Sequence, residues 1–357
     1  MRAWLGWRGL GGRGLAGHEG VSGARVVPGR FGDMSSTESG AAGGATTGIG
    51  TALTGADSDV AVKGAVGDVV GDATGGDGAG ETVRVRMDVS YDGTDFHGWA
   101  AQKGGLRTVQ GVLEEKLTLV CRTPVELTVA GRTDAGVHAD GQVCHADIPA
   151  EAFTQRSLAR PEDLVRRLSR MLPEDIRLNA AVAAPEGFDA RFSALRRHYV
   201  YRVCTAPGGP LPRRVRDTAR WRRPVDLEKV QIAADALVGL NNFAAYCKAR
   251  EGATTIRELQ EFTWKDVSTP AEPQTYEAHV VADAFCWSMV RSIVGACLTV
   301  GEGKRPEGFT AELLELDERS SQVPVAPAEG LNLVGVDYPD ASELAARAAE
   351  TRAVREL

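Results

Sequence analysis

The chain has 357 residues, a formal net charge of −7 and six cysteines. Its length is sufficient for one large domain or two, and its acidic charge excludes a protein that is basic throughout. A groove for nucleic acid is still possible, because it needs only a local positive field. No cysteines form a Cys-x-x-Cys pair, and no His/Cys spacing fits a zinc site. We therefore expect reduced, mostly packed cysteines in a cytoplasmic protein without a metal.

Residues 1–82 are rich in Gly, Ala, Ser and Thr and have no sustained hydrophobic period. A segment of this composition buries too little apolar surface to offset the entropy lost on ordering. It also lacks the apolar core of a secretory signal. The sequence thus predicts a disordered extension over residues 1–82.

A regular pattern begins at Val83, where apolar and polar residues alternate up to Tyr91 as in a half-buried strand. A turn-rich loop with aromatic residues follows up to Trp99, and Thr108 can cap a helix with an apolar face. Further strands are predicted at 125–129, 143–148, 176–182, 196–202, 256–267, 275–284 and 331–336, and further helices after Pro161, Asp226, Phe285, Thr310 and Ala341.

These elements fall into two halves of similar pattern, residues 83–204 and 205–340, followed by a C-terminal tail at 341–357. Neither half has a regular alternation of strand and helix. This favours an α+β fold with two similar α/β subdomains, ferredoxin-like or RRM-like, that share a central, mostly antiparallel sheet. We expect the first half to carry the catalytic loop and the second to complete a basic cleft between them.

The predicted helix after Phe285 is apolar nearly all round, and Arg291 is the only charged residue between Ala284 and Gly301. A core helix and a membrane span are the two interpretations, and the short run with a charge near its middle favours the core. A buried guanidinium needs an acceptor. It either forms a structural ion pair with a distant acid or faces Asp134.

Asp134 lies at the centre of the segment Ala130-Gly-Arg-Thr-Asp-Ala-Gly-Val-His138, which predicted strands flank on both sides. One interpretation is an ordinary turn with local side-chain to backbone bonds. The other is a site loop, because glycines let backbone approach a ligand closely and site residues often lie on loops held by strands. His138 has no chemical role that the sequence suggests.

Arginines and aromatic residues are interleaved in the middle of the chain. Arginines bind phosphates and aromatic rings stack on unpaired bases, so this composition is typical of an RNA surface, although a solvated charged face is the alternative. Asp217 is the only acid between Thr205 and Pro224. The residues concerned are Arg191, Arg196, Arg197, Arg202, Arg213, Arg214, Arg216, Arg220, Arg222 and Arg223, with Tyr199, Tyr201 and Trp221.

The sequence contains no Walker or dinucleotide-binding loop, no Gly-x-Ser-x-Gly and no His-Glu-x-x-His. ATP and NAD are therefore not indicated. A lone aspartate can act as a nucleophile toward a sugar carbon or an electrophilic ring carbon. A glycoside hydrolase would need a second catalytic acid, and none stands out.

The segment from Ala130 to His138 resembles the signature of the TruA family of tRNA pseudouridine synthases. The resemblance extends in order over residues 83–339. Asp283 stands where the family commonly has Asn. The other matching segments are Tyr91-Asp-Gly, Gly98-Trp99, Ala190-Arg-Phe-Ser-Ala194 with Tyr199 and Tyr201, Met289-Val-Arg-Ser-Ile-Val-Gly295, Gly330-Leu-Asn-Leu-Val and Asp337-Tyr-Pro339.

This resemblance implies isomerisation of uridine to pseudouridine at positions 38, 39 and 40 of the tRNA anticodon stem-loop, without cofactor or metal. Asp134 matches the nucleophile, and Arg291 matches the arginine that pairs with it. Tyr199 matches the tyrosine that packs against the target base and has been considered as the base for the C5 proton. Arg132 matches a loop arginine thought to assist base flipping, which a stacked base requires.

The resemblance further implies a homodimer that binds tRNA across two subunits, with no membrane association. The alternative function is a non-catalytic tRNA-binding or folding protein that uses the same basic cleft. Such a protein would bind tRNA in a salt-dependent way without chemistry.

Overall fold

The computed structural model describes residues 81–102, 104–248 and 254–352. These residues all belong to one compact unit of the chain. The predicted disordered extension lies outside the described residues except for its last two, and Thr82 already belongs to the first strand.

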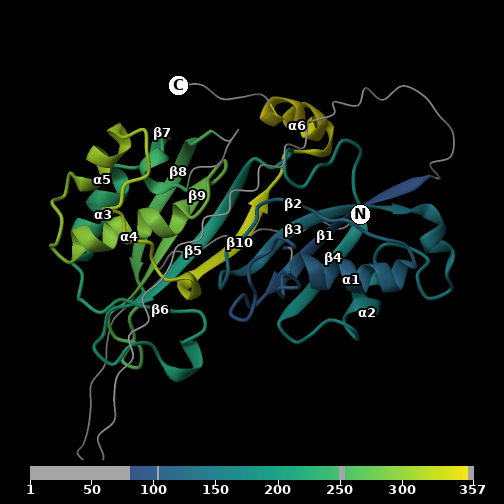
Figure 1. Ribbon diagram of the computed structural model, residues 1–357, viewed down its shortest axis with the longest axis horizontal. Coiled ribbons are helices and arrows are strands. Elements are labelled where there is room, and N and C mark those ends of the chain that lie inside the picture. The colour runs from purple at the N-terminus through teal and green to yellow at the C-terminus, as the bar shows by residue number, and fades with distance from the viewer. Residues whose placement is uncertain (1–80, 103, 249–253, 353–357) are drawn as a thin grey trace, which may run out of the picture. The chain divides into compact units, whose positions relative to one another are not determined.

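One ten-stranded sheet dominates the described residues, with the path β4-β1-β3-β10-β5-β9-β8-β7 and with β2 paired to β3 and β6 to β5 (Figure 1). All pairs are antiparallel except β10 with β3 and β5 with β6. The mixed α/β architecture and the mostly antiparallel sheet confirm that part of the predicted fold class. The strands are β1 (Thr82–Tyr91), β2 (Thr128–Val129), β3 (His138–Pro149), β4 (Ile176–Ala183), β5 (Arg196–Cys204), β6 (Ala219–Arg220), β7 (Gly239–Asn242), β8 (Ile256–Asp266), β9 (Thr275–Ala282) and β10 (Leu331–Asp337).

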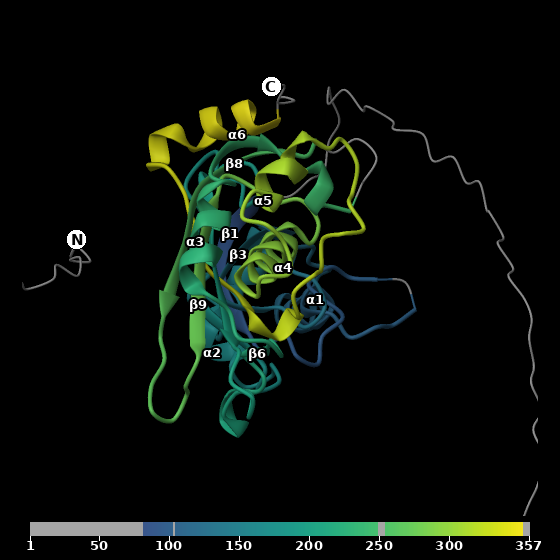
Figure 2. The same cartoon turned by 90° about the vertical axis from the view of Figure 1, so that its left-hand side faces the viewer.

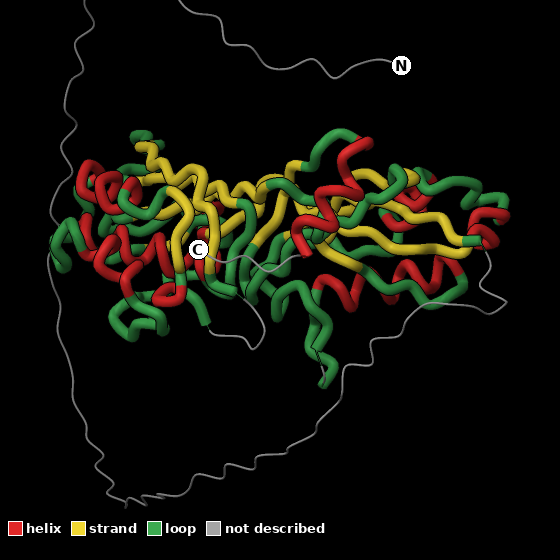
Figure 3. The backbone as a smooth tube through the Cα atoms, turned by 90° about the horizontal axis from the view of Figure 1, so that it is seen from above, coloured by secondary structure: helices red, strands yellow, loops and turns green. Residues whose placement is uncertain are grey.

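Strand β10 is the last strand in the chain but lies in the middle of the sheet, between β3 and β5. It pairs with β3 through Asn332 and His138, and on its other edge it runs antiparallel to β5. Strands from both predicted halves therefore form one continuous band, which is visible from above (Figure 3). The boundary between two subdomains at 204 and 205 stays a proposal.

The helices form where the sequence supplies apolar faces and caps. Thr108 caps α1, since its Oγ1 accepts a bond from Gly111 N at 3.2 Å, and Asp226 caps α3 in the same way. Figure 2 shows α1 and α4 on the same side of the sheet. The α-helices are α1 (Val109–Cys121), α2 (Asp163–Leu168), α3 (Leu227–Asp235), α4 (Met289–Gly301), α5 (Phe309–Glu312) and α6 (Leu344–Arg352).

Helix α4 is the predicted core helix. Every one of its residues except Arg291 is buried, and it packs against α3. In the described part of the chain, no helix is long and apolar enough to cross a membrane.

Two predicted strands have a boundary that differs from the structure by more than two residues. The strand expected at 125–129 is reduced to β2, because the N–H groups of Val125 and Leu127 bond to Thr118 and Glu114 of α1 instead of a neighbouring strand. The strand expected at 143–148 begins earlier, at His138, because β1 and β10 both pair with its first residues.

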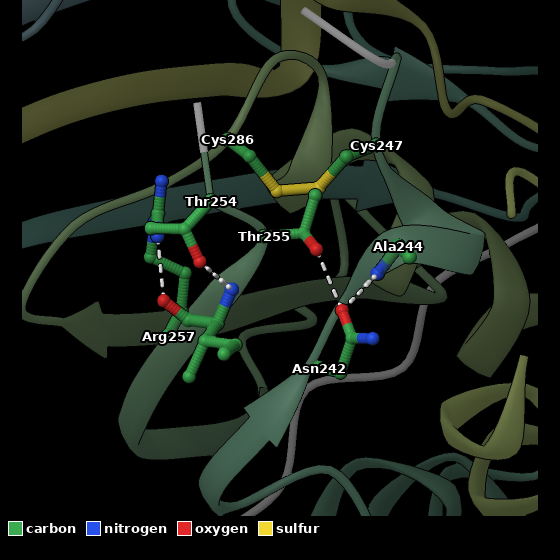
Figure 4. The surroundings of a disulfide bond; sticks show 8 residues. Asn242, Ala244, Cys247, Thr254, Thr255, Arg257 and Cys286 are labelled. Carbon is green, nitrogen blue, oxygen red and sulfur yellow. Dashed lines mark hydrogen bonds between the residues drawn. A yellow bond between two sulfur atoms is a disulfide. The ribbon is translucent and has the colours of Figure 1, made fainter. Parts of the chain in front are cut away.

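The expectation that all cysteines are reduced is wrong. Cys247 and Cys286 form a disulfide, with their Cα atoms 5.8 Å apart (Figure 4). The two residues are 39 positions apart in sequence, and no spacing motif reveals such a pair before the chain is folded. The other four cysteines, Cys121, Cys144, Cys204 and Cys297, are free and buried, as predicted.

Candidate active site

The segment with Asp134 at its centre connects β2 to β3, and buried polar groups fix its path. The Tyr91 hydroxyl lies 2.8 Å from Thr133 Oγ1, and Gln142 Nε2 donates both to Tyr91 Oη at 3.2 Å and to Gly131 O at 2.9 Å. Because Gln142 and Thr133 are buried, these bonds are shielded from water. The loop thus rests on a hydrogen-bonded support from β1 and β3.

The turn after β1 packs its backbone directly against the same loop. Trp99 N donates to Thr133 O at 3.0 Å, and a Cβ on Gly93 would lie 1.9 Å from Val137 O. Gly98 has φ +90, and a Cβ there would lie 2.8 Å from Thr133 O. Glycine is required at both positions because no side chain fits between the two segments.

The Asp134 carboxylate meets the first turn of α4. Arg291 Nη1 lies 3.6 Å from Asp134 Oδ2, and Ser288 Oγ donates to that same oxygen at 3.0 Å. The side chains of Asp134 and Arg291 are 26% and 19% exposed, so the pair is shielded but reachable. Of the two partners considered for Arg291, the structure contains the contact with Asp134.

Backbone contacts hold Arg291 in place. Its Nε donates to Ala326 O at 2.7 Å, and Ala326 N donates to Arg291 O at 2.9 Å. The guanidinium is therefore fixed on one edge by a carbonyl and directs another nitrogen toward the carboxylate. A planar group with several donors suits this double contact better than an ammonium does.

Tyr199 lies on β5 and is 8% exposed. Its ring packs edge-on against Phe285, with 5.1 Å between the centroids. Burial raises the pKa of Tyr199, and the nearby Tyr91 and Asp134 raise it further. At neutral pH the hydroxyl keeps its proton, so it is suited to packing or donating and poorly suited to removing the C5 proton as a base.

Arg132, two residues before Asp134, is exposed at the surface of the loop. That location is compatible with contact to a bound RNA. His138 keeps its structural interpretation: it is buried, and its Nδ1 accepts a bond from Gly93 N at 3.1 Å.

Other elements supply acids to several members of the arginine-rich stretch, in which Asp217 is the only local acid between Thr205 and Pro224. Arg202 pairs with Glu272 and Glu277, and Arg216 pairs with Asp92 and Asp95. These acids come from other elements, so the local sequence does not reveal them. The members Arg213, Arg222 and Arg223 are exposed.

A surface cavity of about 320 Å³ lies where part of this stretch meets the segment after Val325. Its lining combines positive charge with an indole ring. Pro327, also in the lining, follows the residue that holds Arg291. The other lining residues are Arg220, Trp221, Arg222, Arg223, Glu302 and Val325.

Two residues organise the site in a way that the sequence did not predict: Arg197, which was grouped with the arginines of an RNA surface, and Ser288, which was not singled out. Arg197 is 7% exposed, and its guanidinium donates to the carbonyls of Ala130, Arg191 and Asp283. It therefore fastens the start of the loop to two other segments. Along β5 the side chains alternate between inward and outward positions, and Arg197 stands at an inward one. This alternation is the only signal in the sequence that could have distinguished Arg197 from the exposed arginines.

The contacts of Asp283 explain why an aspartate can stand where the TruA family commonly has asparagine. Its Oδ1 accepts bonds from the backbone N–H groups of Glu258 and Ala284, at 3.0 and 2.7 Å. Either side chain supplies an acceptor oxygen at this position.

Comparison with known proteins decides the family. The family model described as tRNA pseudouridine synthase matches residues 88–193 and 233–339, and these ranges contain Asp134, Ser288 and Arg291. The chain belongs to the tRNA pseudouridine synthase family. The resemblance to its TruA members seen in the sequence is thereby confirmed.

Relatives support this membership over nearly their full length. A tRNA pseudouridine synthase A of Corynebacterium glutamicum is 67% identical over 277 residues, which cover 77% of this chain and 96% of the relative. The protein of that name from Mycobacterium leprae is 52% identical over 282 residues, covering 77% and 96%. One from Streptomyces griseus is 52% identical over 278 residues, covering 77% and 95%.

As a member of the tRNA pseudouridine synthase family, the protein is an isomerase that acts on tRNA. No group of three or more His, Cys, Asp or Glu residues suited to a metal ion occurs in the described ranges. The roles of the individual site residues remain predictions.

Proposed function

We propose that the protein isomerises uridine to pseudouridine at positions 38, 39 and 40 of the tRNA anticodon stem-loop, as a cytoplasmic homodimer, with Asp134 as nucleophile. The observation that carries the proposal is the contact of Asp134 with Arg291 and Ser288 at the start of α4. A carboxylate held by donors on a loop supported by strands is suited to a reaction in which it must attack and leave.

The reaction begins when a carboxylate oxygen of Asp134 forms a bond to the target nucleotide. If that bond is to C1′ of the ribose, the C1′–N1 bond breaks and its electron pair stays on uracil N1. The freed uracil turns, C5 bonds to C1′, and the carboxylate leaves with the electron pair of its own bond. The C5 proton then passes to water and N1 takes up a proton, which completes pseudouridine. Attack on the base ring is the alternative first step.

The other predicted residues act around this exchange. The target base must leave its stack before it can turn, and this unstacking costs a few kcal/mol. Arg132 is exposed beside Asp134 and assists the flipping, while Tyr199 packs against the flipped uracil. Arg222, Arg223 and Trp221 line a cavity whose charge and indole ring suit phosphates and unpaired bases.

The test uses an unmodified tRNA transcript with position-resolved detection of pseudouridine. Wild-type protein should form product at positions 38, 39 and 40, and Asp134→Asn should form none while binding tRNA normally. Asp140→Asn is the matched control, because Asp140 is an exposed carboxylate of β3 that bonds Asn332. Full activity of Asp134→Asn would overturn the assignment of the nucleophile.

The homodimer is tested separately by sedimentation velocity. The proposal rests on the TruA resemblance, which implies that tRNA binds across two subunits. A dimer at the concentrations used in the assay is expected. A monomer alone would contradict it.

A further inference from the structure

Ser288 has a backbone conformation that serine rarely adopts. Its φ is 65° and its ψ 11°, in the left-handed region, and among the described residues only Arg122 and Gln274 share a positive φ without being glycine. Such positions occur where the surrounding structure imposes them, and they concentrate at functional sites.

The side chain of Ser288 also lacks the hydrogen bond that a serine commonly makes at the N-terminus of a helix. It occupies the N-cap position of α4, where a serine hydroxyl commonly accepts a bond from the N–H of the second or third helical residue. It makes no side-chain cap bond here. Its hydroxyl points out of the helix and donates to Asp134 Oδ2 at 3.0 Å.

The two donors to Asp134 share one oxygen. Ser288 Oγ and Arg291 Nη1 both contact Oδ2, at 3.0 and 3.6 Å. Among the described residues, none donates a hydrogen bond to Oδ1. The two carboxylate oxygens, equivalent in solution, are therefore distinguished by their surroundings.

We propose that Ser288 is a positioning residue that holds Oδ2 of Asp134 and so presents Oδ1 as the atom that bonds to the substrate. This inference rests on the proposed nucleophile. A carboxylate rotates readily about its Cβ–Cγ bond, since that torsion has broad, roughly two-fold preferences. The contact of Oδ2 with Arg291 is long, at 3.6 Å, whereas the hydrogen bond from Ser288 is 3.0 Å. The bond from Ser288 therefore sets the rotation of the Asp134 carboxylate.

The same arrangement serves the return step. When Oδ1 is bonded to the substrate carbon, Oδ2 is the carbonyl oxygen of an ester and still accepts the bonds from Ser288 and Arg291. When the Oδ1–carbon bond breaks, its electron pair returns to the carboxylate, and the donors stabilise the charge that develops on Oδ2. No further reactant is needed.

Neighbouring contacts hold Ser288 in this conformation. The disulfide of Cys286 lies two residues before it, and Lys248 N donates to Trp287 O at 3.2 Å. Phe285 packs on Tyr199. The short segment 285–288 therefore connects the base-packing tyrosine to the nucleophile.

Two substitutions separate this role from a structural one. Ser288→Ala removes the hydroxyl and keeps the unfavourable φ, whereas Ser288→Gly removes the hydroxyl and relieves it. Both should lower the single-turnover rate of pseudouridine formation about 10- to 100-fold, as small misplacements of reacting groups do. The dissociation constant for tRNA should stay within about twofold, because a change of this kind acts on positioning and leaves binding intact.

The melting temperature of the Ser288→Gly variant is the second measurement. Ser288→Gly should melt at or above the wild-type temperature, so its lower rate cannot come from a damaged fold. Gln274→Gly is the matched control: it relieves the positive φ of an exposed residue that precedes β9, and it should leave the rate unchanged.

Parallel assays of Asp134→Asn distinguish a failure of the positioning role of Ser288 from a failure of the proposed function. If Asp134→Asn is inactive while both Ser288 variants keep the wild-type rate, the positioning role is overturned and the nucleophile stands. If Asp134→Asn is active, the proposed function itself fails. Inactive Asp134→Asn together with slow Ser288→Ala and Ser288→Gly supports the proposal.

Discussion

Arg291 of α4 directs Nη1 to within 3.6 Å of Asp134 Oδ2 while its Nε donates to Ala326 O at 2.7 Å. The guanidinium therefore links the loop before β3 to the segment that precedes β10. Because the carbonyl contact fixes the plane of the guanidinium, the nitrogen that faces Asp134 has little freedom to move away. This relationship connects the two sides of the sheet at the candidate site.

Replacing Arg291 with lysine tests whether this geometry matters beyond charge. Arg291→Lys keeps the positive charge but cannot hold the carbonyl and reach the carboxylate at once. We expect the single-turnover rate to fall by about 100-fold or more, the magnitude typical for loss of an oriented donor. Arg84→Lys is the control, because Arg84 also bonds a carboxylate and a carbonyl, those of Asp147 and Phe188. A wild-type rate in Arg291→Lys would show that charge alone suffices.

Neutralising exposed arginines of the cavity tests how tRNA is bound. Changing Arg222 and Arg223 to glutamine should weaken tRNA binding and lower the slope of log K against log salt by about one to two, roughly one per lost phosphate contact. Filter binding over a salt series measures the slope. Arg216→Gln should change it less, because Arg216 is already paired with Asp92 and Asp95. If the wild type, the variant at Arg222 and Arg223, and Arg216→Gln all gave the same slope, the RNA would not bind at this cavity.

His145 gives the fold a pH dependence of known sign. Burial lowers its pKa below the usual 6.5, Arg84 lowers it further, and its Nδ1 accepts a bond from Ala190 N at 3.0 Å. The unfolded chain therefore binds the proton more readily, so this contribution is complete above about pH 6.5 and is lost as the pH falls below it.

His145→Asn offers an acceptor oxygen near the position of Nδ1 without a group that titrates in this range. Urea unfolding at about pH 7.5 and pH 5 should show a smaller loss of stability for the variant than for the wild type, by linkage. Identical losses would mean that another group controls this range.

The disulfide between Cys247 and Cys286 predicts a stability that depends on reductant. Closing a loop of this sequence separation, 39 residues, contributes up to about 4 kcal/mol in the chain-entropy description. Dithiothreitol should lower the urea midpoint of the wild type and leave that of Cys247→Ser unchanged.

Thiol titration of the denatured protein gives an independent measurement. Four reactive thiols are expected before reduction, those of Cys121, Cys144, Cys204 and Cys297, and all six after it. Cys121→Ser should retain the sensitivity to reductant, since that residue is outside the pair. Six thiols without reduction would contradict the disulfide.

The sequence by itself determined most of the elements and their inward faces. The alternation from Val83 to Tyr91 became β1 with Val85, Met87 and Val89 buried, and the nearly uncharged run after Phe285 became the buried helix α4. These features depend on local periodicity and capping, which neighbouring residues specify. The glycine-rich segment around Asp134 was also recognisable, because its composition is local.

Only the tertiary structure decided which side chains meet. The contact of Ser288 with Asp134, the pairing of Cys247 with Cys286 and the acids opposite Arg202 all join residues from separate elements. Such contacts arise when the sheet brings distant strands into register, and no period along the chain encodes them. The physical reason is that a side chain's partner is set by the packing of whole elements, whereas its secondary structure is set largely by its neighbours in sequence.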